Sequence, residues 1–328
     1  MDTLLEVLAF AGKSLLVFLT FAACAAFLTS RVRGRRPREA FVGLKEISER
    51  WRRNRDEIVA HLLPDPKARK EAHKRLRKQH PPTGPSRRVF VLDFKGDVMA
   101  SAADSLREEV TVVLGIAQAE DEVVLRLESS GGAVHGYGFA ASQLSRLRAA
   151  RIPLTVCVDK VAASGGYMMA CVGSRVLAAP FAILGSIGVV APVPNLHRLL
   201  DRFGVDYEDV TAGKHKRPVS LLGEIHEEGR AKLKEQVDET HQLFKRFVHE
   251  MRPSLDIESV ATGEHWYGTR ALELGLADGL ATSDDYLLEQ ARTSRVFEVT
   301  CERPRTMRER AFSIARRAAR ALESGIAG

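Results

Sequence analysis

The sequence has few of the features that stabilise a small secreted domain or hold a metal. Its four cysteines lie far apart, and no two have a Cys-x-x-Cys spacing: Cys24, Cys157, Cys171 and Cys301. This pattern argues against a disulfide framework and supplies no zinc ligand set. We therefore predict no metal site and no cofactor. Cys157 and Cys171 lie in apolar runs, where cysteine behaves as a small buried hydrophobe.

Aromatic residues are also scarce, at 6% of the chain, and the net charge of +7 is unevenly placed. Residues 31–88 contain 19 Lys and Arg against 7 Asp and Glu, and residues 301–328 contain 7 against 3. The region between them is acidic overall. A nucleic-acid-binding domain needs a basic face with stacking aromatics or a recognisable module, and neither occurs. Nucleic acid is therefore not a predicted partner.

One run near the N-terminus lacks charge from Ser14 to Ser30. A membrane span needs roughly 20 apolar residues, so residues 4–30 are predicted to anchor the chain in the lipid bilayer. The N-terminus is not basic, which favours an uncleaved anchor over a secretory signal, although "AACAA" could be a cleavage site. Five arginines follow within residues 31–38, and positive charge marks the cytoplasmic side. We expect a single-pass inner-membrane protein with its bulk in the cytoplasm; the periplasmic side stays open.

Composition and hydrophobic pattern divide the chain into four regions: an anchor (1–30), a basic helical spacer with a linker (31–88), an α/β domain (89–290) and a basic tail (291–328). In the spacer, apolar residues such as Phe41, Leu44, Ile47 and Trp51 recur at helical spacing and predict one or two surface helices. Beyond residue 300 the tail is rich in Arg and Ala and is predicted to be helical or frayed.

Within the α/β domain, short apolar runs alternate with helical patterns. Strands are predicted at 89–94, 122–127, 152–158 and 175–180, and helices at 101–118, 133–150, from Ser164 onward and at about 224–252. This alternation predicts a largely parallel sheet. A second apolar run at 178–193 is interrupted by proline and glycine, so we expect buried strands there rather than a second membrane span.

Two glycine pairs each follow a predicted strand and open a predicted helix: "LESSGGAVHGYG", with Gly131 and Gly132, and Ser164-Gly165-Gly166. In a parallel sheet both turns fall at the same edge, and both present backbone N–H groups at a helix N-terminus. One turn could supply a serine nucleophile and one N–H of an oxyanion hole, and the other a second N–H. The alternative is that Ser164 is an ordinary helix N-cap.

A serine nucleophile needs a base, and the residues leave its identity open. His135, His197, His215 and His265 are candidates, as are the lysines of "AGKHKR", which follow the strand-like segment "VDYEDVT". A lysine acts as a base only when neutral, so its pKa must fall from about 10.4 to roughly 7–8. Burial beside the site could lower it. The alternative is that this segment is a solvated basic turn.

Five short motifs occur in order along the chain: "ESSGG" (128–132), "AASGGY" (162–167), "GSIGV" (185–189), "GKHK" (213–216) and "HWYGTRALELGLAD" (265–278). With the anchor and basic spacer, they resemble the signal peptide peptidase A family of membrane serine proteases, in particular its SohB branch. The resemblance covers about Val89 to Ala281. Two positions depart from the family pattern: Ser130 replaces a usual proline, and Arg217 replaces a frequent acid.

The resemblance implies a serine endopeptidase with a Ser/Lys dyad, in which Ser164 is the nucleophile and Lys216 the general base, with Lys214 as a competitor. It also implies supporting roles for the oxyanion-hole N–H groups of Gly132 and Gly165, and for Ser186 in orienting the amine. The family fold resembles the ClpP/crotonase superfamily, with repeated ββα units. Relatives form rings, so we expect a homo-oligomeric ring that takes peptide substrates, such as signal-peptide remnants or unfolded or membrane-derived segments.

Two other functional classes stay open. A crotonase-like acyl-CoA enzyme shares the fold and the double-glycine turn, but the anchor and "AASGGYMM" argue against it. A non-catalytic membrane scaffold could retain the dyad residues without using them. Among individual residues, Asp159 is predicted to be a turn acceptor, and Trp266 and Tyr267 are predicted to be packing residues.

Overall fold

The computed structural model describes residues 41–63, 65–78 and 87–302, and Val42–Cys301 form one compact unit. The predicted anchor at 4–30 and most of the predicted tail lie outside the described residues. Among the helices of the described part, none is both long and apolar enough to cross a bilayer. The domain boundaries predicted from composition stay predictions.

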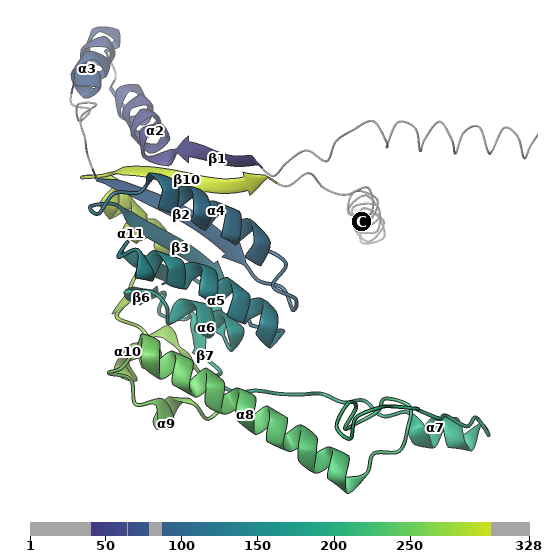
Figure 1. Cartoon of the computed structure of the whole chain (residues 1–328). Coiled ribbons are helices and arrows are strands. Elements are labelled where there is room, and N and C mark those ends of the chain that lie inside the picture. The colour runs from purple at the N-terminus through teal and green to yellow at the C-terminus, as the bar shows by residue number, and fades with distance from the viewer. Residues whose placement is uncertain (1–40, 64, 79–86, 303–328) are drawn as a thin grey trace, which may run out of the picture. The chain divides into compact units, whose positions relative to one another are not determined.

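The centre of the fold is a seven-stranded sheet (Figure 1). Its strands run in the order β1 (Phe41–Glu46), β10 (Arg295–Glu302), β2 (Arg88–Lys95), β3 (Glu122–Glu128), β4 (Leu154–Val158), β6 (Arg175–Ala178) and β9 (Gly279–Leu280). Every pair from β10 to β9 is parallel. The predicted α/β class with a largely parallel sheet is therefore confirmed.

Helices cover both faces of this sheet. Side chains alternate along a strand, so Phe90, Leu92 and Phe94 of β2 join the larger core, which includes residues of α4 (Ala103–Ile116) and α5 (Val134–Ala149). Val89 and Val91 join a smaller core on the opposite face. That core includes residues of α2 (Ile47–His61) and α11 (Ser283–Gln290). Figure 1 shows α4 and α5 side by side over one face.

A second, three-stranded sheet is formed by β5 (Val161–Ala163), β7 (Ile183–Gly185) and β8 (His265–Tyr267). The chain passes twice from the large sheet to the small one, from β4 to β5 and from β6 to β7, and β5 pairs parallel with β7. After β5 it turns into the short helix α6 (Gly165–Ala170). The two sheets together therefore hold the turn at Ser164.

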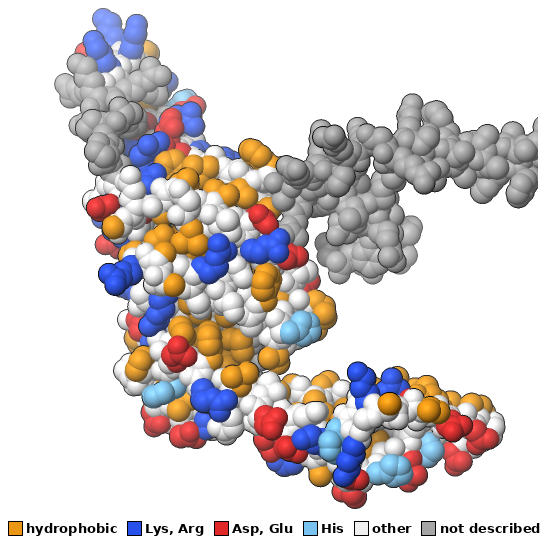
Figure 2. Space-filling model, viewed as in Figure 1, with side chains coloured by type: hydrophobic (Ala, Val, Ile, Leu, Met, Phe, Trp, Pro, Cys, Tyr) orange, Lys and Arg blue, Asp and Glu red, His pale blue; other side chains and the backbone are white. Residues whose placement is uncertain are grey.

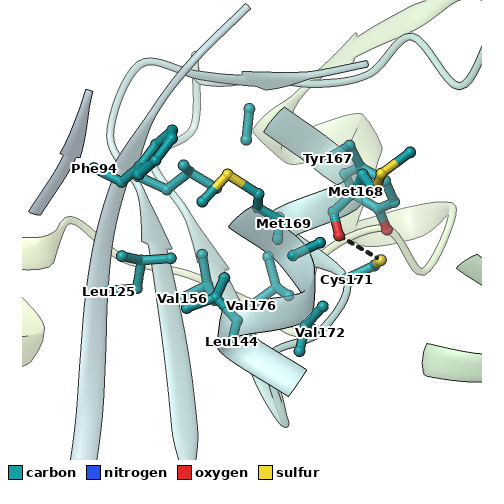
Figure 3. Close-up of a cluster of buried hydrophobic side chains, with 14 of the residues drawn as sticks. Phe94, Leu125, Leu144, Val156, Tyr167, Met168, Met169, Cys171, Val172 and Val176 are labelled. Atoms are coloured by element: carbon teal, nitrogen blue, oxygen red, sulfur yellow. Dashed lines mark hydrogen bonds between the residues drawn. The ribbon is translucent and has the colours of Figure 1, made fainter. Parts of the chain in front are cut away.

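The helix α6 is packed into the larger core. Figure 3 shows Met169 pointing among side chains of four strands, Phe94, Leu125, Val156 and Val176, and all five are essentially inaccessible to solvent. Burial of a large apolar side chain contributes about 1.5–3 kcal/mol. The residues that follow Ser164 are thus fixed by the core rather than left on a surface loop.

Residues 189–226 form a long excursion, which we call the arm. It contains the short helix α7 (His197–Arg202) and leads into the 25-residue helix α8 (Glu227–Met251), as Figure 1 shows. Several hydrogen bonds lie within the arm: Leu196 N–H donates to Leu221 O (2.8 Å), and the Asn195 side-chain amide donates to Ser220 O and Gly223 O. Most of its side chains are exposed.

The short helices α9 (Ile257–Val260) and α10 (Gly268–Glu273) follow α8, and α3 (Pro66–Lys78) follows α2. All strands and helices predicted for 89–180, and the long helix at about 224–252, are confirmed. Two local predictions were wrong. Phe41 and Leu44 belong to the strand β1 rather than to a helix, and the segment 205–211 is not a strand. The latter has strand-forming residues but no neighbouring strand to pair with in the described chain.

Candidate active site

The turn at Ser164 has an unusual backbone conformation. Its φ is 52° and its ψ is −119°, a region that is costly for any residue with a Cβ. Two bonds hold it: the Ser164 N–H donates to Gly185 O (2.8 Å), and Ser164 O accepts from the Met168 N–H (3.0 Å). The hydroxyl makes no capping bond to α6. The N-cap alternative is therefore wrong, and the strained turn leaves the hydroxyl uncommitted.

The Tyr137 side chain of α5 packs directly against this turn. A Cβ added at Gly165 would lie 2.4 Å from the Tyr137 ring, so only glycine allows the two to pack this closely. The Tyr137 hydroxyl donates to Asp97 O (2.8 Å) and lies 2.5 Å from the Ser129 hydroxyl. Burial raises the pKa of this phenol, which keeps it a neutral donor. This role of Tyr137 was not predicted from the sequence.

The two glycine turns predicted to meet do meet. Gly131 has a φ of 89°, and a Cβ there would lie 2.8 Å from Gly165 N and from Ser164 Cβ. Gly132 fits against Val98, whose carbonyl oxygen would be 2.2 Å from an added Cβ. Within the described chain, no hydrogen bond uses the N–H of Gly132 or of Gly165. Both donors are therefore available to a ligand beside Ser164.

A small pocket of about 70 Å³ opens at this point. Its lining includes Ser164 and the two glycines with unused N–H groups, Gly132 and Gly165. The other lining residues are mainly apolar: Val134, Met168, Gly188, Val189, Val190, Thr240 and Phe244. Thr240 and Phe244 are four residues apart on α8 and thus share one helix face. Sequence reasoning missed both, because nothing local distinguishes them from other residues of a long amphipathic helix.

The "GSIGV" motif forms the side of the site next to α8. Ser186 has a φ of 50°, and its N–H donates to Glu264 O (2.6 Å). The next residue, Ile187, accepts from Nε2 of His241 on α8 (3.2 Å). Gly185 packs against Trp266, whose ring would lie 2.8 Å from an added Cβ. The structure thus places Ser186 in the segment that also holds the Ser164 N–H.

Lys216 lies elsewhere in the chain. It is exposed on the arm and does not line the pocket. Its neighbour Lys214 pairs with Glu228 (2.8 Å) in the first turn of α8, whereas the pocket meets α8 at Thr240. These two helix positions are separated by about 18 Å along the helix axis. Within one chain the structure therefore brings Ser164, Gly132 and Gly165 together, with Ser186 close by, but not Lys216.

The remaining motif residues hold the framework together. Tyr167, which ends "AASGGY", donates its hydroxyl to Leu276 O (3.0 Å) in a buried contact. Asp278 exchanges two bonds with Val176, through its backbone N–H and its carboxylate (both 2.7 Å). Asp159 accepts from the N–H and hydroxyl of Ser283, so it is a structural acceptor that links its turn to the start of α11. These contacts explain the motifs without assigning chemistry to them.

The buried thiols take no part in this arrangement. Burial raises the pKa of Cys157 and of Cys171 to about 12, so both stay protonated and inert. In the described residues, no group of three or more His, Cys, Asp or Glu side chains could hold a metal ion. The polar side chains that line the pocket are those of Ser164 and Thr240.

Fold and site together define a class: an α/β protein with a strained serine turn beside two free N–H groups. Comparison with known proteins then identifies the family to which the chain belongs. The model of the peptidase family S49 N-terminal region matches residues 2–144, and that of peptidase family S49 matches residues 146–296. The chain belongs to peptidase family S49. The resemblance read from its five motifs is thereby confirmed.

Several relatives are similar to the chain. The "Probable protease SohB" of Haemophilus influenzae is 57% identical over 211 residues, covering 64% of this chain and 60% of that protein. That of Buchnera aphidicola is 56% identical over 202 residues, covering 62% and 66%. The chain thus matches about 60% of the length of such relatives. A solved structure of a membrane-bound stomatin-specific protease mutant with a substrate peptide is 12% identical, covers 70% of this chain and 98% of that one, and has a TM-score of 0.44.

Proposed function

We propose that this chain is a membrane-anchored serine endopeptidase that cuts peptides through an acyl-enzyme on Ser164. The observation that carries the proposal is the strained turn at Ser164, whose uncapped hydroxyl shares a pocket with the unused N–H groups of Gly132 and Gly165. Membership of a peptidase family and similarity to probable proteases support it. Residues 4–30 would hold the chain in the bilayer as a single span, with the peptidase unit on the cytoplasmic side.

In the proposed reaction, the neutral amine of Lys216 takes the proton of the Ser164 hydroxyl as its oxygen attacks the scissile carbonyl carbon. The carbonyl oxygen becomes an oxyanion that accepts from the N–H groups of Gly132 and Gly165. Lys216 then gives its proton to the leaving amine, and the acyl group remains on Ser164. Water, deprotonated by the same amine, releases the acid. Ser186 would orient the amine by a hydrogen bond.

The same chemistry requires the base to come from a neighbouring copy. Within one chain, Lys216 is exposed on the arm and does not line the pocket around Ser164. Packing of the arm against another copy could bring its amine to that copy's serine and shield it from water. We therefore propose that Lys216 of one copy completes the site around Ser164 of the next, in a homo-oligomeric ring.

The exposed apolar surface of the arm supports such assembly. Val190, Phe203 and Val210 are 83%, 74% and 88% exposed, and several further apolar residues of the arm are at least one-third exposed. An exposed apolar area of this kind is typical of an interaction surface. Packing against a second copy would bury it. The passage of the chain from the large sheet to the small one is also consistent with the ββα units of the ClpP/crotonase fold.

The pocket indicates what kind of peptide would bind. Val189 and Val190 follow the small sheet without pairing to a strand, and could pair with an extended peptide as an added strand. The lining by Met168 and Phe244 favours an apolar side chain next to the scissile bond. Extended apolar peptides, such as signal-peptide remnants or unfolded membrane-derived segments, are therefore the proposed substrates.

Labelling with a serine-directed phosphonate tests the proposal, because the reagent reacts only with an activated hydroxyl. Wild type should be labelled at Ser164, and Lys216→Ala should lose labelling by about 10²–10⁴-fold, the usual contribution of a general base. Lys214→Ala is the matched control and should label normally. Equal labelling of the Lys216→Ala variant would contradict the dyad, and an unreactive wild type would favour a non-catalytic scaffold.

A further inference from the structure

The helix α3 is the most basic element of the described chain. Its 13 residues, PKARKEAHKRLRK, include seven Lys and Arg against the single acid Glu71. Local signals fix its start, because Pro66 takes the first helical position and Asp65 accepts from the N–H groups of Lys67 and Ala68 (3.1 and 3.4 Å). The peptidase chemistry proposed above makes no use of this charge.

Three lysines of α3 face the solvent. Ala68 and Ala72, one turn apart, are partly buried, and α3 packs along α2. Lys67, Lys70 and Lys74 recur at helical spacing on a different face, and all three are exposed. No ion pair within the described residues neutralises them. Figure 2 shows the resulting blue cluster over the position of α3.

Exposed apolar side chains accompany this charge at the end of α2. Ile58 and Leu62 are 61% and 76% exposed and lie four residues apart, directly before the turn into α3. A basic helix face next to exposed aliphatic side chains is the combination found in elements that lie on membrane surfaces. Lysines attract anionic headgroups, and aliphatic side chains insert at the headgroup boundary.

We propose that the basic face of α3, with Ile58 and Leu62, binds the surface of a bilayer containing anionic phospholipids. A polybasic segment beside a membrane gains about 1 kcal/mol for each Lys or Arg near an anionic surface. The uncharged run predicted to enter the bilayer ends at Ser30, and ten residues separate it from the start of β1 at Phe41, so the chain that carries α3 would be tethered to a membrane. Nucleic acid is less suitable, because α3 has no Phe, Tyr or Trp on which a base could stack.

Hydrogen exchange of the full chain in vesicles tests this surface separately from the anchor. The chain is reconstituted into vesicles of phosphatidylcholine alone, or of phosphatidylcholine with phosphatidylglycerol, so that the anchor has a bilayer in both. We expect amides of α3 to exchange roughly tenfold more slowly in the anionic vesicles at low salt. This protection should disappear at about 1 M salt, where the Debye length falls to about 3 Å.

The variant Lys67→Gln/Lys70→Gln/Lys74→Gln should lose the protection, and because Gln and Lys have similar helix propensities α3 should still form. The control Lys160→Gln/Lys234→Gln/Arg270→Gln removes three exposed charges elsewhere and should keep it. Equal exchange in the two vesicle types would overturn the proposal, as would an equal loss in the control. Protection by an RNA or DNA oligonucleotide, but not by the anionic lipid, would also overturn it.

Discussion

The turn at Ser164 and the arm that carries Lys216 are built in opposite ways. The turn is held by two backbone hydrogen bonds, by the Tyr137 ring packed against Gly165 and by the buried helix α6. The arm is held mainly by its own hydrogen bonds and exposes apolar side chains such as Phe203 and Val210. One chain thus completes the nucleophile half of the proposed site and leaves the base half unburied. The contrast suggests that assembly, rather than folding, would complete the enzyme.

Among changes to the turn at Ser164, replacing the proposed nucleophile should have the largest effect on activity. Ser164→Ala removes the proposed attacking oxygen and should lower peptide hydrolysis by roughly 10⁴-fold or more. Ser130→Ala removes an exposed hydroxyl from the neighbouring glycine turn and should leave the rate nearly unchanged. Both rates are measured with a fluorogenic peptide. If Ser164→Ala retained wild-type activity, the site would lie elsewhere, or the activity would belong to a contaminant.

Assembly should be the property most sensitive to changes in the arm. Phe203→Asp/Val210→Asp places two charges on the exposed apolar surface and should dissociate the oligomer, because burying unpaired charges is costly. The unfolding free energy of a single chain should change by less than about 0.5 kcal/mol, since neither side chain is buried. Sedimentation in detergent measures assembly, and Leu288→Asp, at an exposed position of α11, is the control. An unchanged oligomer would show that the arm is not its interface.

Tight packing under the nucleophile should also be measurable as stability. Gly165→Ala would push a methyl group into the Tyr137 ring at 2.4 Å, and overpacking of this kind costs about 1–3 kcal/mol. Gly138→Ala lies on the same helix as Tyr137 with nothing within 4 Å, and should be stabilising by up to about 1 kcal/mol. Urea unfolding compares the two. A Gly165→Ala variant as stable as wild type would mean that the turn is not rigidly supported.

A smaller, pH-dependent effect is expected in the body of the fold. Burial raises the pKa of Glu109 from 4.5 to about 7, while its carboxylate accepts from the Cys301 N–H (2.8 Å). The folded state then binds the proton more tightly than the unfolded one, so stability falls as pH rises from about 4.5 to about 7. The loss is at most about 3 kcal/mol.

Glu109→Gln keeps an acceptor for Cys301 and removes the titration. Its unfolding free energy should therefore exceed that of wild type at pH 8 and approach it at pH 5. Urea titrations at several pH values measure this difference, and parallel pH profiles for the two proteins would contradict it.

Sequence alone predicted the features that depend on local signals. The strand that ends at Val158, the glycine-rich turn at Ser164 and the helix after it lie within a short stretch, and parallel strands bring both glycine turns to one edge. Sequence could not predict that Tyr137 packs under Gly165 or that Phe244 lines the pocket. Those contacts join helices and turns far apart in the chain, and nothing near either residue indicates its partner.

In the arm, by contrast, the sequence pattern predicted an element that the structure does not contain. Residues 205–211 have strand-forming side chains, and sequence predicted a strand there, but a strand exists only where another strand pairs with it. Phe41 and Leu44 fitted a helical pattern by chance, because two residues three apart do not distinguish a helix from an edge strand. In both places the side-chain pattern is present in the sequence, but it does not indicate whether another strand lies alongside the segment.

Mixing two inactive variants tests most directly whether the site forms between copies. Ser164→Ala retains Lys216, and Lys216→Ala retains Ser164, so each supplies what the other lacks only if the dyad joins two chains. Random co-assembly of equal amounts should restore about one quarter of the wild-type sites. Recovery of activity on that scale is the predicted result. Verified mixed oligomers that stay as inactive as the separate variants would contradict the account.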